Sequence, residues 1–152
     1  EAGAIFGASE EAAALVAEQR AELDAVEVDD SGRTALWWSS GTDVPYVGAG
    51  TGTPQMIMDA LGLTNIAADI ADTWSPLSVE SIVAANPDVI VLVNASWNTV
   101  ESKKAFLAAN PAMASLDAVV NERFLTIPFA AGEAGVRTVP ATVDLAEQLK
   151  AL

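Results

Sequence analysis

The sequence has 152 residues, 51% of them hydrophobic, and its 21 acidic and 7 basic side chains give a formal net charge of −14. This length predicts a single domain with its own core, and no apolar run approaches the roughly 18 residues of a membrane-spanning helix. Histidine and cysteine are both absent. Their absence excludes disulfides and thiolate sites, and it disfavours a hydrolytic triad, a zinc site or haem ligation by this chain alone.

The strong acidity bears on the kinds of partner that the chain binds. A surface of this charge repels nucleic acid and anionic membranes, so we expect neither as a direct partner. It suits a basic protein partner or a high-salt, acid-rich proteome, or it serves only to keep the protein in solution.

The first predicted element is a helix from Ser9 to about residue 26. Ser9 is expected as its N-cap, and Glu10 and Glu11 fall in the first turn, where the helix dipole favours acids. Its apolar residues recur at helical spacing: Ala12, Leu15, Val16, Leu23 and Val26. Residues 29–32 then have the composition of a turn.

Two tryptophans lie side by side in the next element, a strand predicted over residues 34–38. Because neighbouring residues of a strand face opposite sides, we expect one of Trp37 and Trp38 in the core and the other facing a helix layer or the outside. Small and polar residues over 39–43 then form a loop that leads to a short apolar segment at 46–47.

A glycine-rich turn over residues 48–52 precedes a helix that Thr53 and Pro54 are expected to open and Gly62 to close. A strand before the turn and a helix after it resemble the setting of a nucleotide-binding loop. The turn lacks the glycine at position 53 that a dinucleotide fingerprint requires, and no lysine follows it as in a P-loop. A tight turn that holds a ligand-side loop is therefore favoured over phosphate binding.

The remaining elements alternate between helices and short apolar strands. They are helices over 78–85, 99–109 and 140–152 and strands over 89–93 and 124–127. The run 89–93 is unbroken in apolar residues, which is typical of a strand buried on both faces of a parallel sheet. The alternation predicts an α/β fold, a three-layer αβα sandwich with a mostly parallel central sheet.

Paired acids such as Asp69 and Asp72 are weak evidence for acid–base chemistry, because so acidic a chain offers many such pairs. We therefore assign no catalytic residue and no metal site, and we expect no resident cofactor.

Three residues near predicted connections are candidates for contact with another molecule. Glu80 lies in the first turn of the helix over 78–85, where it either interacts with the helix dipole or projects to pair with an arginine of another protein. Trp74 and Trp97 are expected in loops at the carboxyl-end side of the strands, where open α/β sheets bind ligands. Each indole either contacts a ligand or partner or packs beneath its loop.

The segment 128–137, after the last predicted strand, is punctuated by glycines and contains Phe129 and Arg137. Arg137 is one of seven cations in the chain, and it either binds an anionic ligand or pairs with nearby acids. Arg137 is therefore a candidate contact for an anionic ligand.

Four segments match, in order, short patterns of one known family. Residues 77–91, LSVESIVAANPDVIV, resemble its signature S-x-E-x-[LIV]-x-x-x-x-P-D-[VL]-I, and residues 58–67 resemble its helix ending in L-G-[GL]-x-N-[IV]. Residues 110–111 with 121–124 and residues 139–149 resemble its N-P and G-R segments and its terminal helix. The family is that of the substrate-binding proteins of iron-siderophore and vitamin B12 ABC importers, and the resemblance covers nearly the whole chain.

This resemblance implies that residues 1–152 form a single domain, the C-terminal lobe of a two-lobe receptor whose N-terminal lobe lies outside this sequence. Residues 1–26 resemble part of the helix region that crosses between the lobes, and any address label would lie upstream of Glu1. By the same likeness, Glu80 engages arginines of the ABC permease, and Trp74 takes the place of a ligand-contacting tryptophan of the B12-binding relatives. The connections expected to supply other ligand contacts are 39–43, 50–53, 95–98 and 129–137, which contain Thr51, Trp97, Phe129 and Arg137.

The resemblance thus implies a non-enzymatic, extracytoplasmic receptor, in the periplasm or lipid-anchored to the outer face of the cell membrane. Its expected cargo is a chelated metal, first a ferric siderophore, with haem or cobalamin as alternatives for which the other lobe could supply axial ligands. Membrane contact is expected only through the permease subunits or an upstream anchor. Two other classes stay open: a doubly wound enzyme domain that binds a nucleotide or Mg²⁺, and a scaffold or adhesin that keeps the receptor fold.

Overall fold

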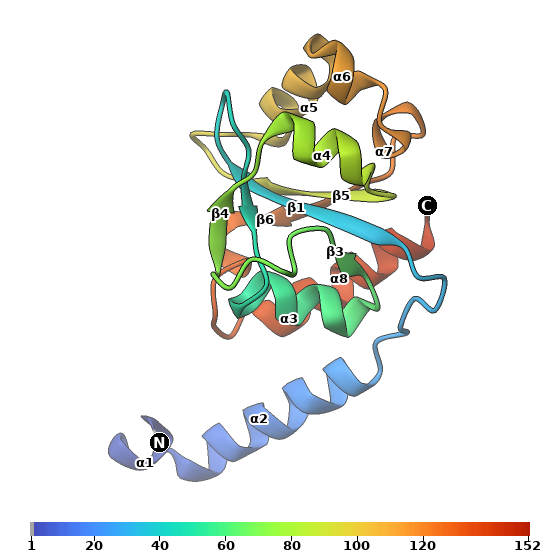
Figure 1. Ribbon diagram of the computed structural model, residues 1–152. Helices are drawn as coiled ribbons and strands as arrows, with labels where there is room; N and C mark the ends of the chain where they lie inside the picture. The colour runs from blue at the N-terminus through green and yellow to red at the C-terminus, as the bar shows by residue number, and fades with distance from the viewer. Residues whose placement is uncertain (1) are drawn as a thin grey trace.

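The computed structural model describes residues 2–152, and a six-stranded sheet lies at its centre (Figure 1). The sheet has the order β4-β2-β1-β5-β6, with β3 as an extra strand beside β1. Strands β1 (Thr34–Ser40), β5 (Val89–Asn94) and β6 (Phe124–Pro128) run parallel to one another. The strands predicted from the sequence at these places are therefore confirmed, each extended by one or two residues.

The other three strands are short and complete one edge of the sheet. Strand β3 (Thr64–Asn65) pairs in parallel with the beginning of β1, while β2 (Tyr46–Gly48) pairs antiparallel with its end. Strand β4 (Trp74–Pro76) then pairs antiparallel with β2. The prediction that Trp74 lies in a loop was wrong. Its strand arises from pairing with β2, a long-range partner that leaves no periodic pattern in three residues.

Helices cover both faces of the sheet (Figure 1). Helices α3 (Gly52–Leu61) and α8 (Thr138–Lys150) cover one face. Helices α4 to α7 cover the other, with the bounds α4 (Val79–Ala85), α5 (Val100–Ala109), α6 (Pro111–Ala114) and α7 (Asp117–Val120). This arrangement is the predicted three-layer αβα sandwich.

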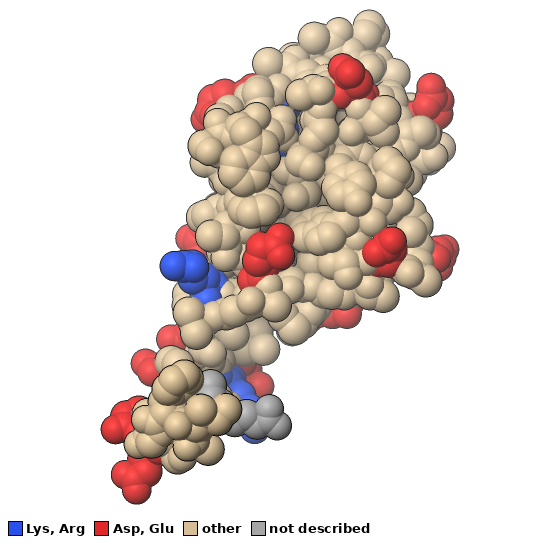
Figure 2. Space-filling model, turned by 90° about the vertical axis from the view of Figure 1, so that its left-hand side faces the viewer, with Lys and Arg blue, Asp and Glu red and all other residues tan. Residues whose placement is uncertain are grey.

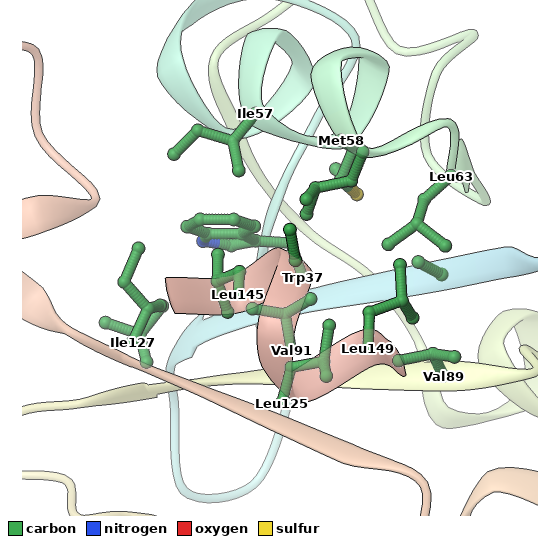
Figure 3. Packing of buried hydrophobic residues seen from close by; sticks show 14 of the residues in the cluster. Trp37, Ile57, Met58, Leu63, Val89, Val91, Leu125, Ile127, Leu145 and Leu149 are labelled. Atoms are coloured by element: carbon green, nitrogen blue, oxygen red, sulfur yellow. The ribbon is translucent and has the colours of Figure 1, made fainter. Parts of the chain in front are cut away.

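The two adjacent tryptophans of β1 supply the centres of two separate cores. Trp37 is fully buried between Ile57 and Met58 of α3 and Leu145 of α8 (Figure 3). Trp38 is 1% exposed on the other face and packs edge-on against Phe106 of α5. Both indoles are therefore core residues, each beneath its own helix layer, because alternation along the strand sends them to opposite faces.

The chain begins with α1 (Ala2–Ile5) and α2 (Ser9–Asp24), which extend away from the sandwich beneath α3 and α8 (Figure 1). The predicted helix is confirmed, although Ala8 rather than Ser9 takes the N-cap position. Its apolar stripe meets the core only at Val26, just after the helix: α2 itself has no buried residue, and Leu15 and Val16 are 43% and 50% exposed. None of the helices within residues 2–152 combines the length and the apolar character that crossing a membrane requires.

Side-chain caps explain where two of the predicted helices begin. Ser78 and Thr99 accept hydrogen bonds from backbone N–H groups three residues ahead and so begin α4 and α5 as predicted. The expected start of α3 at Thr53 and Pro54 was wrong, because Thr51 takes the N-cap position and both residues lie inside the helix. Helix α8 begins at residue 138, two residues before the predicted start, and a 3₁₀ turn, η1 (Phe129–Ala131), follows β6.

Candidate functional site

The connections that follow the parallel strands lie on one side of the molecule, at the left of Figure 1. We call this side the carboxyl-end face and define it by residues 39–45, 95–99 and 129–137 together with the start of α3 at 49–52. Figure 2 looks directly onto it and shows a broad surface of uncharged side chains among which single acidic groups are scattered. Such a face is where open α/β sheets bind ligands.

Two of the predicted contact residues meet on this face. The rings of Trp97 and Phe129 stand edge to face, with their centroids 4.9 Å apart and their planes at 72°. Trp97 follows β5 and is 66% exposed, while Phe129 opens η1 after β6 and is half-buried. The Trp97 side chain is thus largely exposed while it packs against Phe129. Its exposed apolar surface suits contact with another molecule.

Backbone and side-chain bonds fix the turn that carries Trp97. The backbones of Ala95 and Asn98 form a two-way bridge, with N···O distances of 3.4 and 3.1 Å. The side-chain oxygen of Asn94 accepts a hydrogen bond from the N–H of Val100 at 3.3 Å. We call residues 94–98 the Trp97 turn.

A buried lysine lies beneath this turn. Lys103 of α5 is 1% exposed, and its Nζ donates to the carbonyl oxygens of Val93 at 2.6 Å and Asn98 at 2.7 Å. Burial lowers the pKa of this ammonium from 10.5 to about 8. Lys103 was not among the residues predicted from the sequence, although its spacing from the apolar residues Val100 and Leu107 places it on the buried side of α5.

A pocket of about 200 Å³ opens beside Trp97, between the β1–β2 connection and the start of α5. Its lining residues are Trp38, Gly41, Thr42, Trp97, Asn98, Ser102, Lys103 and Phe106. The side-chain oxygen of Asn98 is buried here and has no hydrogen-bond partner within residues 2–152. The pocket thus has aromatic walls, and the largely buried residues Asn98 and Lys103 complete its lining.

The backbone N–H groups of the glycine-rich loop before α3 form hydrogen bonds within the protein. The N–H groups of Ala49, Gly50 and Thr51 donate to backbone oxygens of the segment 70–73 at 2.9 to 3.0 Å. A phosphate-binding loop must turn such N–H groups toward its ligand. The loop instead holds Thr51 at the cap of α3, where its hydroxyl lies 3.3 Å from that of Thr73.

Asn65 supports the same loop from below. It is 4% exposed, and its side-chain nitrogen donates to the backbone oxygens of Gly48 and Ala49 at 3.2 and 3.1 Å and to the side chain of Gln55 at 2.9 Å. Its side-chain oxygen accepts from the N–H of Ala67 at 2.9 Å. Asn65 therefore fixes Gly48 and Ala49, the part of the loop that leads to Thr51.

None of the ring contacts and ion pairs formed within residues 2–152 joins Trp74, Glu80 or Arg137 to the aromatic pair. Trp74 is half-buried against the core cluster of Trp37, in a strand that β2 and β1 separate from β5. Glu80 is exposed at the second residue of α4. Arg137 is exposed at the cap position of α8 and forms no ion pair with the residues that the structure describes.

The acids that the structure describes do not assemble a metal centre. Within residues 2–152, no group of three or more His, Cys, Asp or Glu side chains is placed to hold a metal ion. Asp69 and Asp72, the pair singled out from the sequence, lie in the exposed loop that receives the N–H groups of the glycine-rich turn.

Comparisons with known proteins agree on one family. A family model described as periplasmic binding protein matches residues 1–131. A periplasmic binding protein from Veillonella parvula has 28% identity and a TM-score of 0.86, and the match covers 99% of this chain and 54% of that one. The periplasmic haem-binding protein RhuT from Roseiflexus sp. RS-1 has 26% identity and a TM-score of 0.81, covering 97% and 58%.

A third similar structure, an ABC-type Fe³⁺-hydroxamate transport system from Saccharomonospora viridis, has 24% identity and a TM-score of 0.85, covering 96% of this chain and 51% of that one. No curated protein sequence matches. The chain spans between about half and three fifths of the length of these three structures.

Proposed function

Because this chain belongs to the periplasmic binding protein family, we propose that it is the C-terminal lobe of an extracytoplasmic receptor that delivers a chelated metal to an ABC importer. In this proposal α1 and α2 form part of the helix region between the lobes, and the N-terminal lobe lies outside the sequence. The exposed stripe of α2 supports the proposal, since Leu15 and Val16 find no cover within residues 2–152.

The observation that carries the proposal is the exposed Trp97–Phe129 pair on the carboxyl-end face. A flat aromatic surface on a largely uncharged face suits a bulky organic ligand better than a bare ion (Figure 2). One lobe offers only half of an enclosing site. We therefore expect high affinity only when the second lobe covers the ligand from the other side.

We propose a ferric siderophore as the cargo, with Trp97, Phe129, Thr51, Arg137 and Trp74 as contact residues. The similar structures include one described as an Fe³⁺-hydroxamate transport system and one described as a haem-binding protein. A free metal ion is disfavoured because this lobe contains no histidine. Haem and cobalamin are the alternative cargoes within the same proposal.

Glu80 is proposed to dock the receptor onto the permease. Its carboxylate is exposed at the beginning of α4, free to meet an arginine of a membrane partner. Charge pairs of this kind fix orientation and speed encounter more than they add affinity. Contact with the membrane would then pass through the permease or through an anchor upstream.

The enzyme alternative has less support. Its nucleotide would need the N–H groups of the glycine-rich loop, and those of Ala49, Gly50 and Thr51 already donate to residues 70–73. Its Mg²⁺ would need clustered carboxylates, and the described residues present no cluster of three.

The test is a titration of the full-length protein that contains this chain. Ferrioxamine B, haem, cobalamin and Mg²⁺-ATP are added separately, and binding is followed by tryptophan fluorescence and calorimetry. Saturable quenching by the ferric trihydroxamate supports the siderophore proposal. Binding of haem or cobalamin alone would support the receptor proposal but change the proposed cargo. Binding of Mg²⁺-ATP alone would overturn the receptor proposal.

A further inference from the structure

Lys103 is the buried cation of this fold. The residue is 1% exposed, and it takes part in none of the ion pairs formed within residues 2–152. Removing an ammonium from water without a counter-charge is costly, so its position requires other compensation. The two carbonyl oxygens that accept from Nζ, those of Val93 and Asn98, supply it through short charge-assisted hydrogen bonds.

These two carbonyls lie on either side of the exposed part of the Trp97 turn. Val93 is the last buried residue of β5 before the chain leaves the sheet, and Asn98 is the first buried residue after Trp97. The Lys103 ammonium therefore links the residue just before the Trp97 turn to the last residue of the turn. The exposed indole lies between them, held against Phe129.

We propose that Lys103 is a positioning residue that fixes the Trp97 turn and thereby presents the indole as part of the ligand-binding surface. The role of the indole in ligand binding rests on the proposed function. The role of Lys103 in fixing the turn does not depend on it. A methionine would fill nearly the same volume, so the need for an ammonium lies in the two carbonyl contacts and not in packing.

The first test compares amide hydrogen exchange in the unsubstituted chain and in Lys103→Met. The reporters are the N–H groups of Ala95, Asn98 and Val100, which all bond within or next to the turn. We expect exchange at these reporters to quicken by about tenfold or more, because the substitution removes both charge-assisted hydrogen bonds of Lys103. Exchange in the centre of β5 should stay unchanged.

Lys104→Met is the matched control. Lys104 is the next residue of α5, but it is exposed and lies over the ring of Phe124 at 4.8 Å from the centroid. Its replacement should leave the reporters unchanged. Unaltered exchange of the reporters in Lys103→Met would overturn the proposal, and so would an equal effect of the two substitutions.

Ligand affinity distinguishes positioning of Trp97 from a purely structural role of Lys103. In the full-length protein, Lys103→Met should weaken binding of ferrioxamine B by about tenfold, and the same change in a Trp97→Ala background should have little further effect. Equal losses in both backgrounds would overturn the positioning role. If the unsubstituted protein fails to bind the chelate, the proposed cargo fails, and the exchange result still decides the role of Lys103 in the turn.

A further test restores an ammonium group at position 103 by chemical modification. The chain has no cysteine, so Lys103→Cys can be alkylated in denaturant at one place and refolded. The adduct with 2-bromoethylamine rebuilds a lysine analogue and should restore slow exchange at the reporters, whereas the neutral adduct with iodoacetamide should not. Equal behaviour of the two adducts would overturn the proposal.

A measurement on the unsubstituted chain covers the case in which the variants do not fold. With ¹⁵N-labelled lysine at pH 6, the buried ammonium of Lys103 should give a sharp resonance that exchanges slowly with water, with scalar couplings to two carbonyl carbons. The exposed ammonium of Lys104 should give none. Absence of a protected ammonium resonance in the folded chain would also overturn the proposal.

Discussion

The indole of Trp97 rests edge-on against the ring of Phe129, and the two residues belong to different connections of the sheet, one after β5 and the other after β6. Their contact joins neighbouring turns of the carboxyl-end face into one aromatic surface. Pairs of this geometry contribute about 0.5–1.5 kcal/mol beyond the area that they bury. The pair is thus strong enough to orient the two rings and leaves most of the indole open.

Trp97→Ala should reduce the affinity of the full-length receptor for a ferric trihydroxamate by on the order of tenfold, because it removes the largest exposed apolar surface of the face. The free energy of unfolding should change by less than about 1 kcal/mol, since the side chain is 66% exposed. Val120→Ala, at an equally exposed position on α7, is the control and should bind normally. Unchanged affinity in Trp97→Ala would remove this residue from the site.

Glu80→Ala should leave folding and ligand affinity nearly unchanged and should slow transport by the intact import system, by about tenfold if one charge pair is lost. Glu101→Ala is a close control. Glu101 is also an exposed acid at the second residue of a capped helix, in the order Thr99-Val100-Glu101-Ser102 against Ser78-Val79-Glu80-Ser81. Equal transport by the two variants in a reconstituted system would show that Glu80 does not dock.

Asp88→Asn should lower the free energy of unfolding by roughly 1–2 kcal/mol at pH 7, as expected for losing hydrogen bonds to a charged acceptor. The carboxylate of Asp88 accepts from the backbone N–H of Thr34 at 2.8 Å and from its hydroxyl at 2.9 Å. The bond from this N–H is the main reason that the pKa of Asp88 lies below its ordinary value of 3.8.

The same shift fixes the pH dependence of that effect. A lowered pKa contributes stability above the unfolded value of 3.8, and the contribution is lost as the pH falls through the folded value. Urea unfolding from pH 7 to pH 2 should therefore show the gap between the unsubstituted chain and Asp88→Asn closing below about pH 3.8. The exposed Asp30→Asn should show no such gap, and a gap that persists at pH 2 would contradict the argument.

Lys103 should give a trend in the alkaline range. Its pKa is lowered by burial from 10.5 to about 8, so between these pH values the unfolded chain holds the proton and the folded chain has released it. The free energy of unfolding of the unsubstituted chain should therefore rise with pH from about 8 to 10.5, relative to Lys103→Met. Chemical denaturation of both proteins across this range measures the difference, and a constant difference would show that Lys103 titrates normally.

Gly50→Ala should destabilise the chain by roughly 1–3 kcal/mol, because a methyl group at this position would overlap the backbone oxygen of Ala68. The shift of the loop should also disturb Thr51 and lower ligand affinity. Gly135→Ala is the matched control, since a methyl group there meets no atom within 4 Å. Thermal unfolding of the two variants should differ clearly, and equal stability would mean that the loop over 66–73 yields easily.

The sequence predicted the parallel part of the fold because local signals coincide with tertiary structure there. The apolar run of β5 and the caps Ser78 and Thr99 fix elements without reference to distant residues. The two faces of β1 follow from simple alternation, which places Trp37 and Trp38 in opposite cores. These features are set within a few residues of the chain.

The failures of prediction involve partners that are distant in the sequence. Strand β4 exists because of its pairing with β2, and the start of α3 at Thr51 follows from bonds to the loop over 70–73. The approach of Trp97 to Phe129 and the burial of Lys103 likewise depend on how β5, α5 and β6 meet. A lysine within an apolar helical stripe was the one local signal that would have identified the last of these.

The bonds between Asp88 and Thr34 tie the amino ends of β1 and β5 together, at the end of the sheet opposite to the aromatic pair. The bonds that tie β1 to β5 and the proposed ligand-binding surface thus lie at opposite ends of the sheet. The exposed residues of the connections near the aromatic pair can vary, while the bonds between Asp88 and Thr34 keep β1 and β5 in register. A library that randomises the exposed residues 96–97 and 133–136 should accordingly yield folded proteins at high frequency, which makes this small scaffold a starting point for proteins that bind other ligands.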